Sequence, residues 1–343
     1  MHFFEIPYYV GLSAKKYYSF RGQKRLPAGV ISIGNLTAGG TGKTPAAIAV
    51  AGEALKRGFG PVILTRGYKG SAAGPCFVSK GDAPLLTVEE AGDEPYLMAC
   101  KLKGVPVIKG TRRYDAGMFA VKELEATDSF PKGKMLFILD DGFQHWGLYR
   151  DRDIVLIDSD NPFGNDMLLP FGRLREPVKS VERADIIVIT KNIGPCNASA
   201  CRSDAVVDII RRHNRHASIF WSSHKPAACK PATGGKEPAG GLSGKRVFGF
   251  CGLGAPEAFR RTLLSLGVEL AGFAAFRDHY KYRKEDILNI KAAAARAGAD
   301  WIATTEKDII KTSGLDLPDN ILIIEVEFSI AEDFYSELFK DMR

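Results

Sequence analysis

The residues best suited to chemistry follow the apolar run Val30–Ile33, in a glycine-rich stretch that ends in Gly-Lys-Thr at residues 42–44. Glycine lacks a Cβ, so backbone N–H groups can converge on phosphate oxygens, and a following helix points its positive end at the same anion. Lys43 would reach the β- and γ-phosphates of a nucleotide, and the Thr44 hydroxyl would ligate Mg²⁺. Thr37 takes the place of the first glycine in the general G-x-x-x-x-G-K-[ST] pattern. The expected nucleotide-binding loop consists of Thr37, Ala38, Gly39, Gly40, Thr41, Gly42, Lys43 and Thr44.

A second candidate is the pair Asp140 and Asp141, which follows the apolar run Met135–Leu139. Functional groups of parallel sheets gather at the carboxyl ends of strands, and an Asp there can hold Mg²⁺ directly or through water. Apolar runs that end in Asp are also common turns, so the preceding phosphate loop is what favours the metal interpretation. Residues 190–192 read T-K-N and lack the acid of a guanine-reading T-K-x-D loop, so ATP is the expected nucleotide.

Three further clusters have both a chemical and a structural interpretation. Asp93 begins a predicted helix, where it could be an N-cap or a general base that accepts the proton of an attacking hydroxyl. Asp278 and His279 could form a catalytic dyad, a buried structural pair or a surface turn. Four basic residues follow strands at one sheet edge, where they could bind anions or be solvated: Arg66, Lys109, Arg112 and Arg113.

The elements that must position these residues alternate between strand and helix, which predicts a parallel α/β sheet. In the first part of the chain we expect strands at 30–33, 62–65, 105–108, 135–139, 154–157 and 186–189, helices at 45–57, 93–102 and 113–124, and a loop at 66–88. In the second part we expect a short strand at 218–224, a Pro/Gly-rich linker at 232–241, strands at 247–251, 301–304 and 321–328, helices from 256 and at 284–297, and a C-terminal helix. Gly252 and Gly254 fit a tight turn better than a dinucleotide-binding motif, because Glu257 replaces the third glycine.

Composition agrees with a globular chain of two domains. The 343 residues are 45% hydrophobic and 25% charged, and the net charge of +7 favours anionic partners without choosing among them. The six cysteines contain no C-x-x-C pair, which indicates reduced cytosolic thiols rather than a disulfide framework or a zinc site.

The segment of residues 1–25 combines aromatic side chains with lysines and arginines, and Glu5 is its only acid. It is too interrupted for a transmembrane helix and lacks the features of a secretion signal. An amphipathic helix remains, on which Ile6, Val10, Tyr17 and Phe20 share one face. This face could lie in a bilayer interface with anionic lipid, or pack on the helix's own domain.

Taken together, these motifs resemble one family, the tetraacyldisaccharide 4′-kinases (lipid A 4′-kinases) of Gram-negative bacteria. Thr37 fits that family, in which a hydroxyl residue is usual at this place. The resemblance covers nearly the whole chain and rests on these stretches: 34–45, 65–68, 92–95, 140–145, 172–177, 250–254, 278–279 and 304–308.

The resemblance implies ATP-dependent phosphorylation of the 4′-hydroxyl of a tetraacylated glucosamine disaccharide 1-phosphate in lipid A biosynthesis. The protein would be peripheral on the cytoplasmic face of the bacterial inner membrane, and neither nucleic acid nor an obligate protein partner is expected. The implied fold is a P-loop NTPase-type parallel sheet domain and a smaller α/β/α domain, joined by a two-stranded link. The corresponding ranges are a membrane-interface helix at 1–25, a kinase domain at 26–215 to which a helix at 329–343 returns, and a second domain with the linker strands at 216–328.

The resemblance also implies roles for individual residues. Asp93 would be the catalytic base, with His279 from the second domain tuning or orienting it, and Lys43 would serve the phosphates. Thr44, Asp140, Asp141 and Glu176 would serve Mg²⁺. The residues expected to support the site or to bind substrate are Arg66, Glu94, Arg113, Gln144, His145, Arg175 and Asp278.

Two other functions are compatible with a phosphate loop. A dimeric switch ATPase of the partitioning type would carry a lysine early in the loop, where Ala38 stands in this chain. A non-catalytic nucleotide-binding membrane module would leave Asp93 and His279 without a role. The kinase is therefore the preferred hypothesis.

Overall fold

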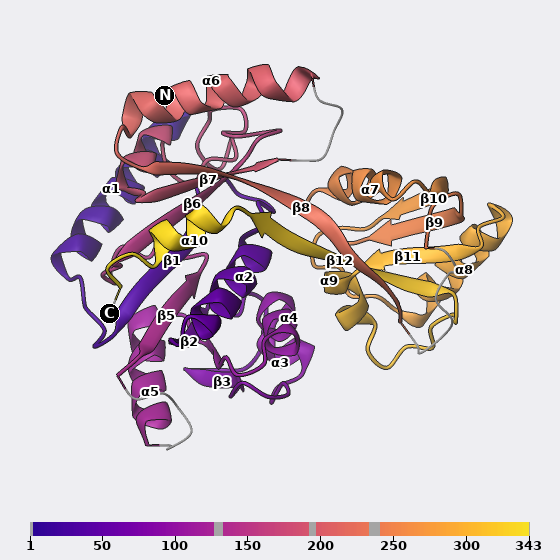
Figure 1. Cartoon of the computed structure of the whole chain (residues 1–343), viewed down its shortest axis with the longest axis horizontal. Helices are drawn as coiled ribbons and strands as arrows, with labels where there is room; N and C mark the ends of the chain where they lie inside the picture. Colours follow the sequence, from indigo (N-terminus) through magenta and orange to yellow (C-terminus); the bar gives the residue numbers. More distant parts are fainter. Residues whose placement is uncertain (1–2, 127–132, 192–196, 233–240, 343) are drawn as a thin grey trace. The chain divides into compact units, whose positions relative to one another are not determined.

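The structure is a computed structural model that describes residues 3–126, 133–191, 197–232 and 241–342 (Figure 1). The chain divides into two compact units, unit 1 (Met1–Ser223 and Ile330–Arg343) and unit 2 (His224–Ser329). It passes from unit 1 to unit 2 within β8 (Ser218–Pro231) and returns at the end of β12 (Ile321–Ile330). Strands and helices alternate in both units, which confirms the α/β fold class. The domain ranges inferred from the resemblance stay predictions.

Unit 1 contains a mostly parallel sheet with the strand order β8-β7-β6-β1-β5-β2-β4-β3, in which, among the described residues, only β3 and β4 pair antiparallel. The strands besides β8 are β1 (Gly29–Asn35), β2 (Gly60–Thr65), β3 (Cys76–Ser79), β4 (Val107–Lys109), β5 (Met135–Asp140), β6 (Arg152–Asp158) and β7 (Ile186–Lys191). The strands β2, β4 and β5 are buried along their whole length, which is typical of a parallel sheet covered on both faces.

Helices cover the sheet of unit 1. Ala116 and Ala120 of α5 share an apolar cluster with Phe137 of β5, and Ile210 of α6 packs in a cluster with Val155 of β6. Helix α2 packs on β1, β2 and β5 (Figure 1). The helices of this unit are α1 (Ile6–Arg21), α2 (Lys43–Lys56), α3 (Val88–Ala91), α4 (Asp93–Lys101), α5 (Arg113–Glu125), α6 (Asn197–His213) and α10 (Glu332–Leu338), with short 3₁₀ helices at Phe3–Glu5 and Val178–Arg183.

Unit 2 is a smaller three-layer arrangement around the order β10-β9-β11-β12-β8. Alternate residues of β9 point to opposite faces, so Val247 packs with Phe259 of α7 whereas Phe250 packs with Ile287 of α8. Helices therefore cover both faces of this sheet. The remaining elements are β9 (Arg246–Cys251), α7 (Pro256–Ser265), β10 (Glu269–Ala275), α8 (Lys284–Arg296), β11 (Trp301–Thr305), α9 (Glu306–Ile309) and a 3₁₀ helix at Ile310–Thr312.

The structure differs from the sequence-based prediction at several elements. The loop predicted at 66–88 is wrong in part, because it contains β3, a four-residue edge strand whose pairing with β4 is interrupted between Phe77 and Ser79. The prediction contains neither α6 nor β10, and it makes β8 too short, since this strand runs for 14 residues. A partly exposed strand such as β10 gives a weak periodic signal. The linker predicted at 232–241 lies mostly outside the described residues.

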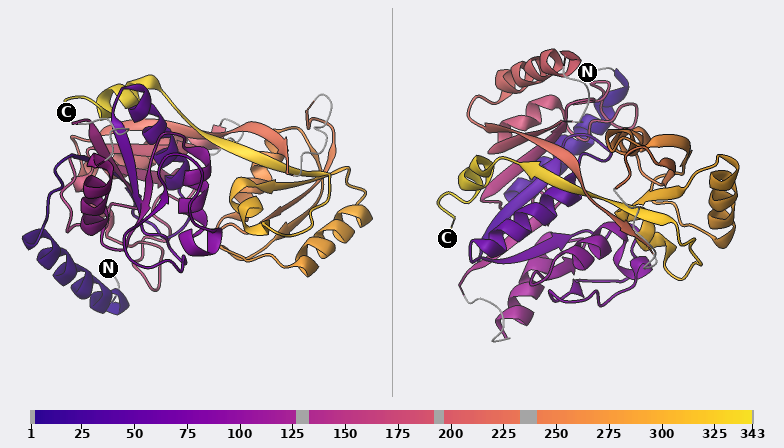
Figure 2. Two further views of the ribbon diagram at one scale, coloured as in Figure 1. Left: turned by 90° about the horizontal axis from the view of Figure 1, so that it is seen from below. Right: turned by 45° about the vertical axis from the view of Figure 1, so that its right-hand side comes forward.

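Helix α1 lies on the outside of unit 1 (Figure 2), and none of its residues is buried. Its start is fixed at two points: the backbone N–H of Leu168 donates to the buried carboxylate of Glu5 at 2.5 Å, and the Tyr8 hydroxyl donates to the carbonyl of Arg175 at 3.0 Å. Ile6, Val10, Tyr17 and Phe20, predicted to share a face, are all exposed. Within the described ranges, no helix is long and apolar enough to cross a membrane.

Candidate active site

The phosphate loop connects β1 to α2 in the predicted order of strand, loop and helix. Gly39 and Gly42 have φ of 128° and 81°, values that favour glycine, and α2 begins at Lys43 instead of the predicted Pro45. The Lys43 ammonium donates to the side chain of Asn35 at 3.1 Å and lies 3.6 Å from the carboxylate of Asp141. These two contacts therefore hold the Lys43 ammonium group beside the phosphate loop.

Asp140 ends β5 beside this loop, because parallel pairing places it opposite Ile33 of β1. Its side chain is buried and accepts a hydrogen bond from the Thr65 hydroxyl at 3.1 Å. Burial, followed by the negative charges of Glu94 and Asp141, raises the pKa of Asp140 to about 7. A nearby cation would therefore strongly favour the ionised form of the Asp140 carboxyl group.

Asp141 is in the opposite electrostatic state, although it directly follows Asp140. One guanidinium nitrogen of Arg175 lies 2.8 Å from each of its carboxylate oxygens. Burial alone would raise the pKa of Asp141, but the positive charges of Lys43 and Arg175 outweigh it and hold the pKa below its ordinary value. Asp141 is thus a stable carboxylate at neutral pH.

Arg113 lies under the carboxylate pair and is almost fully buried. It donates to the backbone carbonyls of Gly110 at 2.6 Å and Asp140 at 3.2 Å. Burial lowers its pKa to about 10, so the guanidinium remains charged at neutral pH. Burial, together with the charge of Arg113, lowers the pKa of His145 to about 3, which leaves that imidazole neutral. Arg66 is exposed.

Glu176 belongs to a second buried network next to the loop. Its carboxylate accepts hydrogen bonds from Gln144 at 3.0 Å and Arg183 at 2.9 Å, and a second nitrogen of Arg183 lies 2.9 Å from its other oxygen. The Gln144 amide also donates to the backbone carbonyl of Asn35 at 3.0 Å. The carboxylate of Glu176 is therefore already paired with Arg183, and its role as a ligand of Mg²⁺ stays a prediction.

Asp93 is the first residue of α4 and is partly buried. The N-cap of this helix is Gly92, with no side-chain capping bond, so the capping role considered for Asp93 falls to its neighbour. Glu94 lies close enough to Asp140 for its charge to raise the pKa of that carboxyl group. The role of Asp93 as a base is consistent with this position and stays a prediction.

Asp278 and His279 form a turn in unit 2. The backbone N–H of His279 donates to its neighbour's carboxylate at 3.0 Å, and the imidazole Nε2 lies 3.8 Å from the other carboxylate oxygen. His279 has φ of 59°, which is uncommon for residues other than glycine and often marks functional positions. The Lys307 ammonium lies 3.8 Å from the same Asp. The pairing of His279 with Asp93 stays a prediction.

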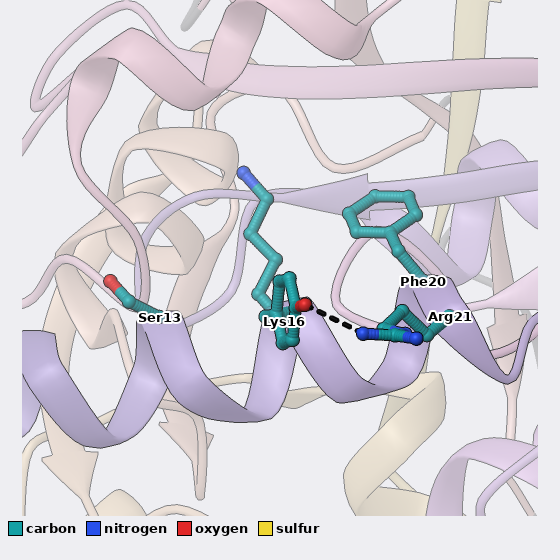
Figure 3. A pocket seen from close by; sticks show the side chains of 5 residues that line it. Ser13, Lys16, Phe20 and Arg21 are labelled. Atoms are coloured by element: carbon teal, nitrogen blue, oxygen red, sulfur yellow. Dashed lines mark hydrogen bonds between the residues drawn. The ribbon is translucent and has the colours of Figure 1, made fainter.

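A pocket of about 500 Å³ lies along α1. Figure 3 shows Lys16 and Phe20 extending from the same side of the helix, and Arg21 donates to the Tyr17 hydroxyl at 2.8 Å. Burial and the nearby charge of Arg183 lower the pKa of Lys16. Ser13 and these four side chains line the pocket, so its lining combines apolar rings with positive charge.

Sequence reasoning assigned no role to Asn35, Thr65 or Arg183, which hold Lys43, Asp140 and Glu176 in place, respectively. Thr65 ends a predicted strand and Asn35 lies two residues beyond another, positions that could have drawn notice to them. Arg183 lies in a 3₁₀ helix with no motif of its own, and only the fold brings it to Glu176.

Known proteins resemble this chain over most of its length. It matches the family model described as tetraacyldisaccharide-1-P 4′-kinase over residues 6–343. A tetraacyldisaccharide 4′-kinase of Syntrophus aciditrophicus (strain SB) is 40% identical over 328 residues, covering 92% of this chain and 86% of the relative. One of Geobacter metallireducens is 40% identical over 290 residues, covering 84% and 80%.

A solved structure agrees with these relatives. The crystal structure of the "apo" form of LpxK from Aquifex aeolicus in complex with ATP is 30% identical, with a TM-score of 0.74 over 99% of this chain and 98% of that one. These matches favour the kinase over the switch ATPase and the non-catalytic membrane module. The chain belongs to the tetraacyldisaccharide-1-P 4′-kinase family.

Proposed function

We propose that this kinase transfers the γ-phosphoryl group of ATP to the 4′-hydroxyl of a tetraacylated glucosamine disaccharide 1-phosphate, with Mg²⁺, at the cytoplasmic face of the bacterial inner membrane. The observation that carries the proposal is the convergence of Lys43 and the Asp140–Asp141 pair beside a phosphate loop in a chain of this family. Phosphoryl transfer depends mainly on positioning and on neutralising charge, and these groups supply both.

In the proposed reaction the 4′-oxygen forms a bond to the γ-phosphorus while the bond to the β–γ bridging oxygen breaks and ADP leaves. Asp93 accepts the proton of the attacking hydroxyl, and His279 orients Asp93. Lys43 stabilises the negative charge on the transferring group. The ion pair with Arg175 keeps Asp141 ionised and fixed next to this lysine.

The residues at the end of β5 fit a magnesium ion. Buried Asp140, next to Glu94 and Asp141, concentrates negative charge that a divalent cation would offset. Thr44, Asp140 and Asp141 would hold the ion, which would neutralise phosphate charge, and Glu176 could join them only if its pair with Arg183 opened. Among the described residues no three His, Cys, Asp or Glu side chains form a metal site by themselves, so phosphate oxygens of ATP would complete the coordination.

Helix α1 supports attachment to the membrane. Its exposed apolar side chains, which include Val10 and Tyr18 at 58% and 73% exposure, alternate with lysines and arginines. Exposed apolar side chains interspersed with positive charges would suit a bilayer interface that contains anionic lipid. The pocket along α1 would then face the lipid substrate.

The nucleotide site is tested by Lys43→Ala. Without the ammonium group the transferring phosphoryl group loses charge stabilisation, so we expect kcat/KM to fall about a hundredfold or more. The measurement is transfer of label from ATP to the disaccharide 1-phosphate in detergent micelles. Lys56→Ala, at the exposed far end of α2, is the matched control. Turnover close to that of the wild type in a folded Lys43→Ala protein would overturn the assignment.

The dyad is tested by a double-mutant cycle. If His279 acts through Asp93, then Asp93→Ala and His279→Ala should each lower kcat far more than they raise KM. The double variant should have a kcat only slightly below that of the less active single variant. ATP binding should persist in all three, because the phosphate loop is untouched. Losses that multiply independently, or a silent His279→Ala, would refute the dyad.

The membrane role of α1 is tested by two matched substitutions, Val10→Asp and Leu85→Asp, at side chains of equal 58% exposure. A charge in the interface opposes insertion, so we expect only Val10→Asp to weaken binding to anionic vesicles, by about tenfold. It should also raise the KM for micellar substrate while leaving a short-chain soluble analogue unaffected. Equal vesicle binding by both variants would support a helix that merely packs on its own domain.

A further inference from the structure

Arg173 is held against the phosphate loop by its backbone. Thr37 and Leu174 form an antiparallel bridge, and the backbone N–H of Ala38 donates to the carbonyl of Arg173 at 2.6 Å. On the other side, the N–H of Arg175 donates to the carbonyl of Leu36 at 2.7 Å. Residues 173–175 therefore run alongside the first residues of the loop, and the position of Arg173 relative to the loop is fixed.

The side chain of Arg173 extends over the loop. A Cβ added to Gly39 would lie 2.6 Å from Nη2 and 3.7 Å from Cζ of Arg173. A Cβ added to Gly164 would lie 3.0 Å, 3.5 Å and 3.6 Å from its Cβ, Cγ and Cδ. Both glycines have positive φ, of 128° and 66°. The aliphatic part of the Arg173 side chain thus lies along Gly164. Its guanidinium lies beside Gly39, in the middle of the phosphate loop.

Three other cations at this site, in contrast to Arg173, are already engaged by the protein. Lys43 and Arg175 pair with Asp141, and Arg113 donates to backbone carbonyls. The guanidinium of Arg173, in contrast, has no hydrogen bond or ion pair with any residue that the structure describes. A guanidinium presents donors in a planar fork that matches the oxygens of a phosphate group.

We propose that Arg173 is a nucleotide-binding residue whose guanidinium binds phosphate oxygens of ATP over Gly39. This proposal rests on one part of the proposed function, namely that the nucleotide is ATP. It does not depend on the identity of the lipid acceptor. The bound phosphates replace the water that solvates the exposed guanidinium. The loop backbone and Arg173 then hold the phosphates from different directions.

The test is the dissociation constant of a non-hydrolysable ATP analogue, measured by calorimetry on the full chain. Charge-assisted hydrogen bonds to a phosphate are strong, so Arg173→Ala should raise the Kd about tenfold or more. Arg173→Lys should recover part of this loss. Arg173→Gln, which keeps an aliphatic stem to pack on Gly164 but not the charge, should behave like Arg173→Ala. Lys56→Ala, which removes an exposed charge at the far end of α2, should leave the Kd unchanged.

Two outcomes would overturn the proposal. An unchanged Kd in Arg173→Ala would show that the guanidinium does not contact the nucleotide. A normal Kd in Arg173→Gln together with a raised Kd in Arg173→Ala would show that the side chain only supports the loop by packing. Because this measurement needs no acceptor, a failure of the proposed lipid substrate would appear separately, as wild-type protein that binds the analogue but does not phosphorylate the disaccharide.

Discussion

The candidate active site depends on the ion pairs of Asp141 with Lys43 and Arg175. They join three segments that are distant in the sequence: the start of α2, the end of β5 and the loop before the 3₁₀ helix at Val178–Arg183. Two cations on one carboxylate keep Asp141 ionised, whereas its neighbour Asp140 is buried with a pKa raised to about 7. The site therefore has a fixed anion next to a carboxyl group that a cation would ionise.

The segment 168–176 connects this site to the outside of unit 1. Leu168 and Arg175 hold the start of α1 through Glu5 and Tyr8. The same segment bridges to the phosphate loop at Thr37 and carries the guanidinium that binds Asp141. The helix proposed to lie in the membrane interface is thus bound to the segment that shapes the nucleotide site.

The sequence predicted the parts of the site that depend on local order. A β-branched strand, glycines and Gly-Lys-Thr identify the phosphate loop, and an apolar strand that ends in Asp identifies Asp140 and Asp141, because both signals lie within about a dozen residues. It could not predict the pairing of Glu176 with Arg183 or the contact of Arg173 with Gly39, since these follow from tertiary packing. The edge strand β3 was missed for a similar reason, since its pairing with β4 and the packing of Phe77 in a cluster with Ile108 and Phe119 stabilise it.

The central claim is that Asp140 and Asp141 hold Mg²⁺ beside the phosphate loop. The most direct test measures how strongly Mg²⁺ affects nucleotide binding in the variants Asp140→Asn and Asp141→Asn. The affinity of a non-hydrolysable ATP analogue would be measured with and without Mg²⁺, and Asp115→Asn on the surface of α5 would be the control. We expect Mg²⁺ to tighten binding in the wild type and the control, and each active-site variant to lose most of this gain while still binding the metal-free analogue. Full magnesium dependence in both variants would contradict the assignment.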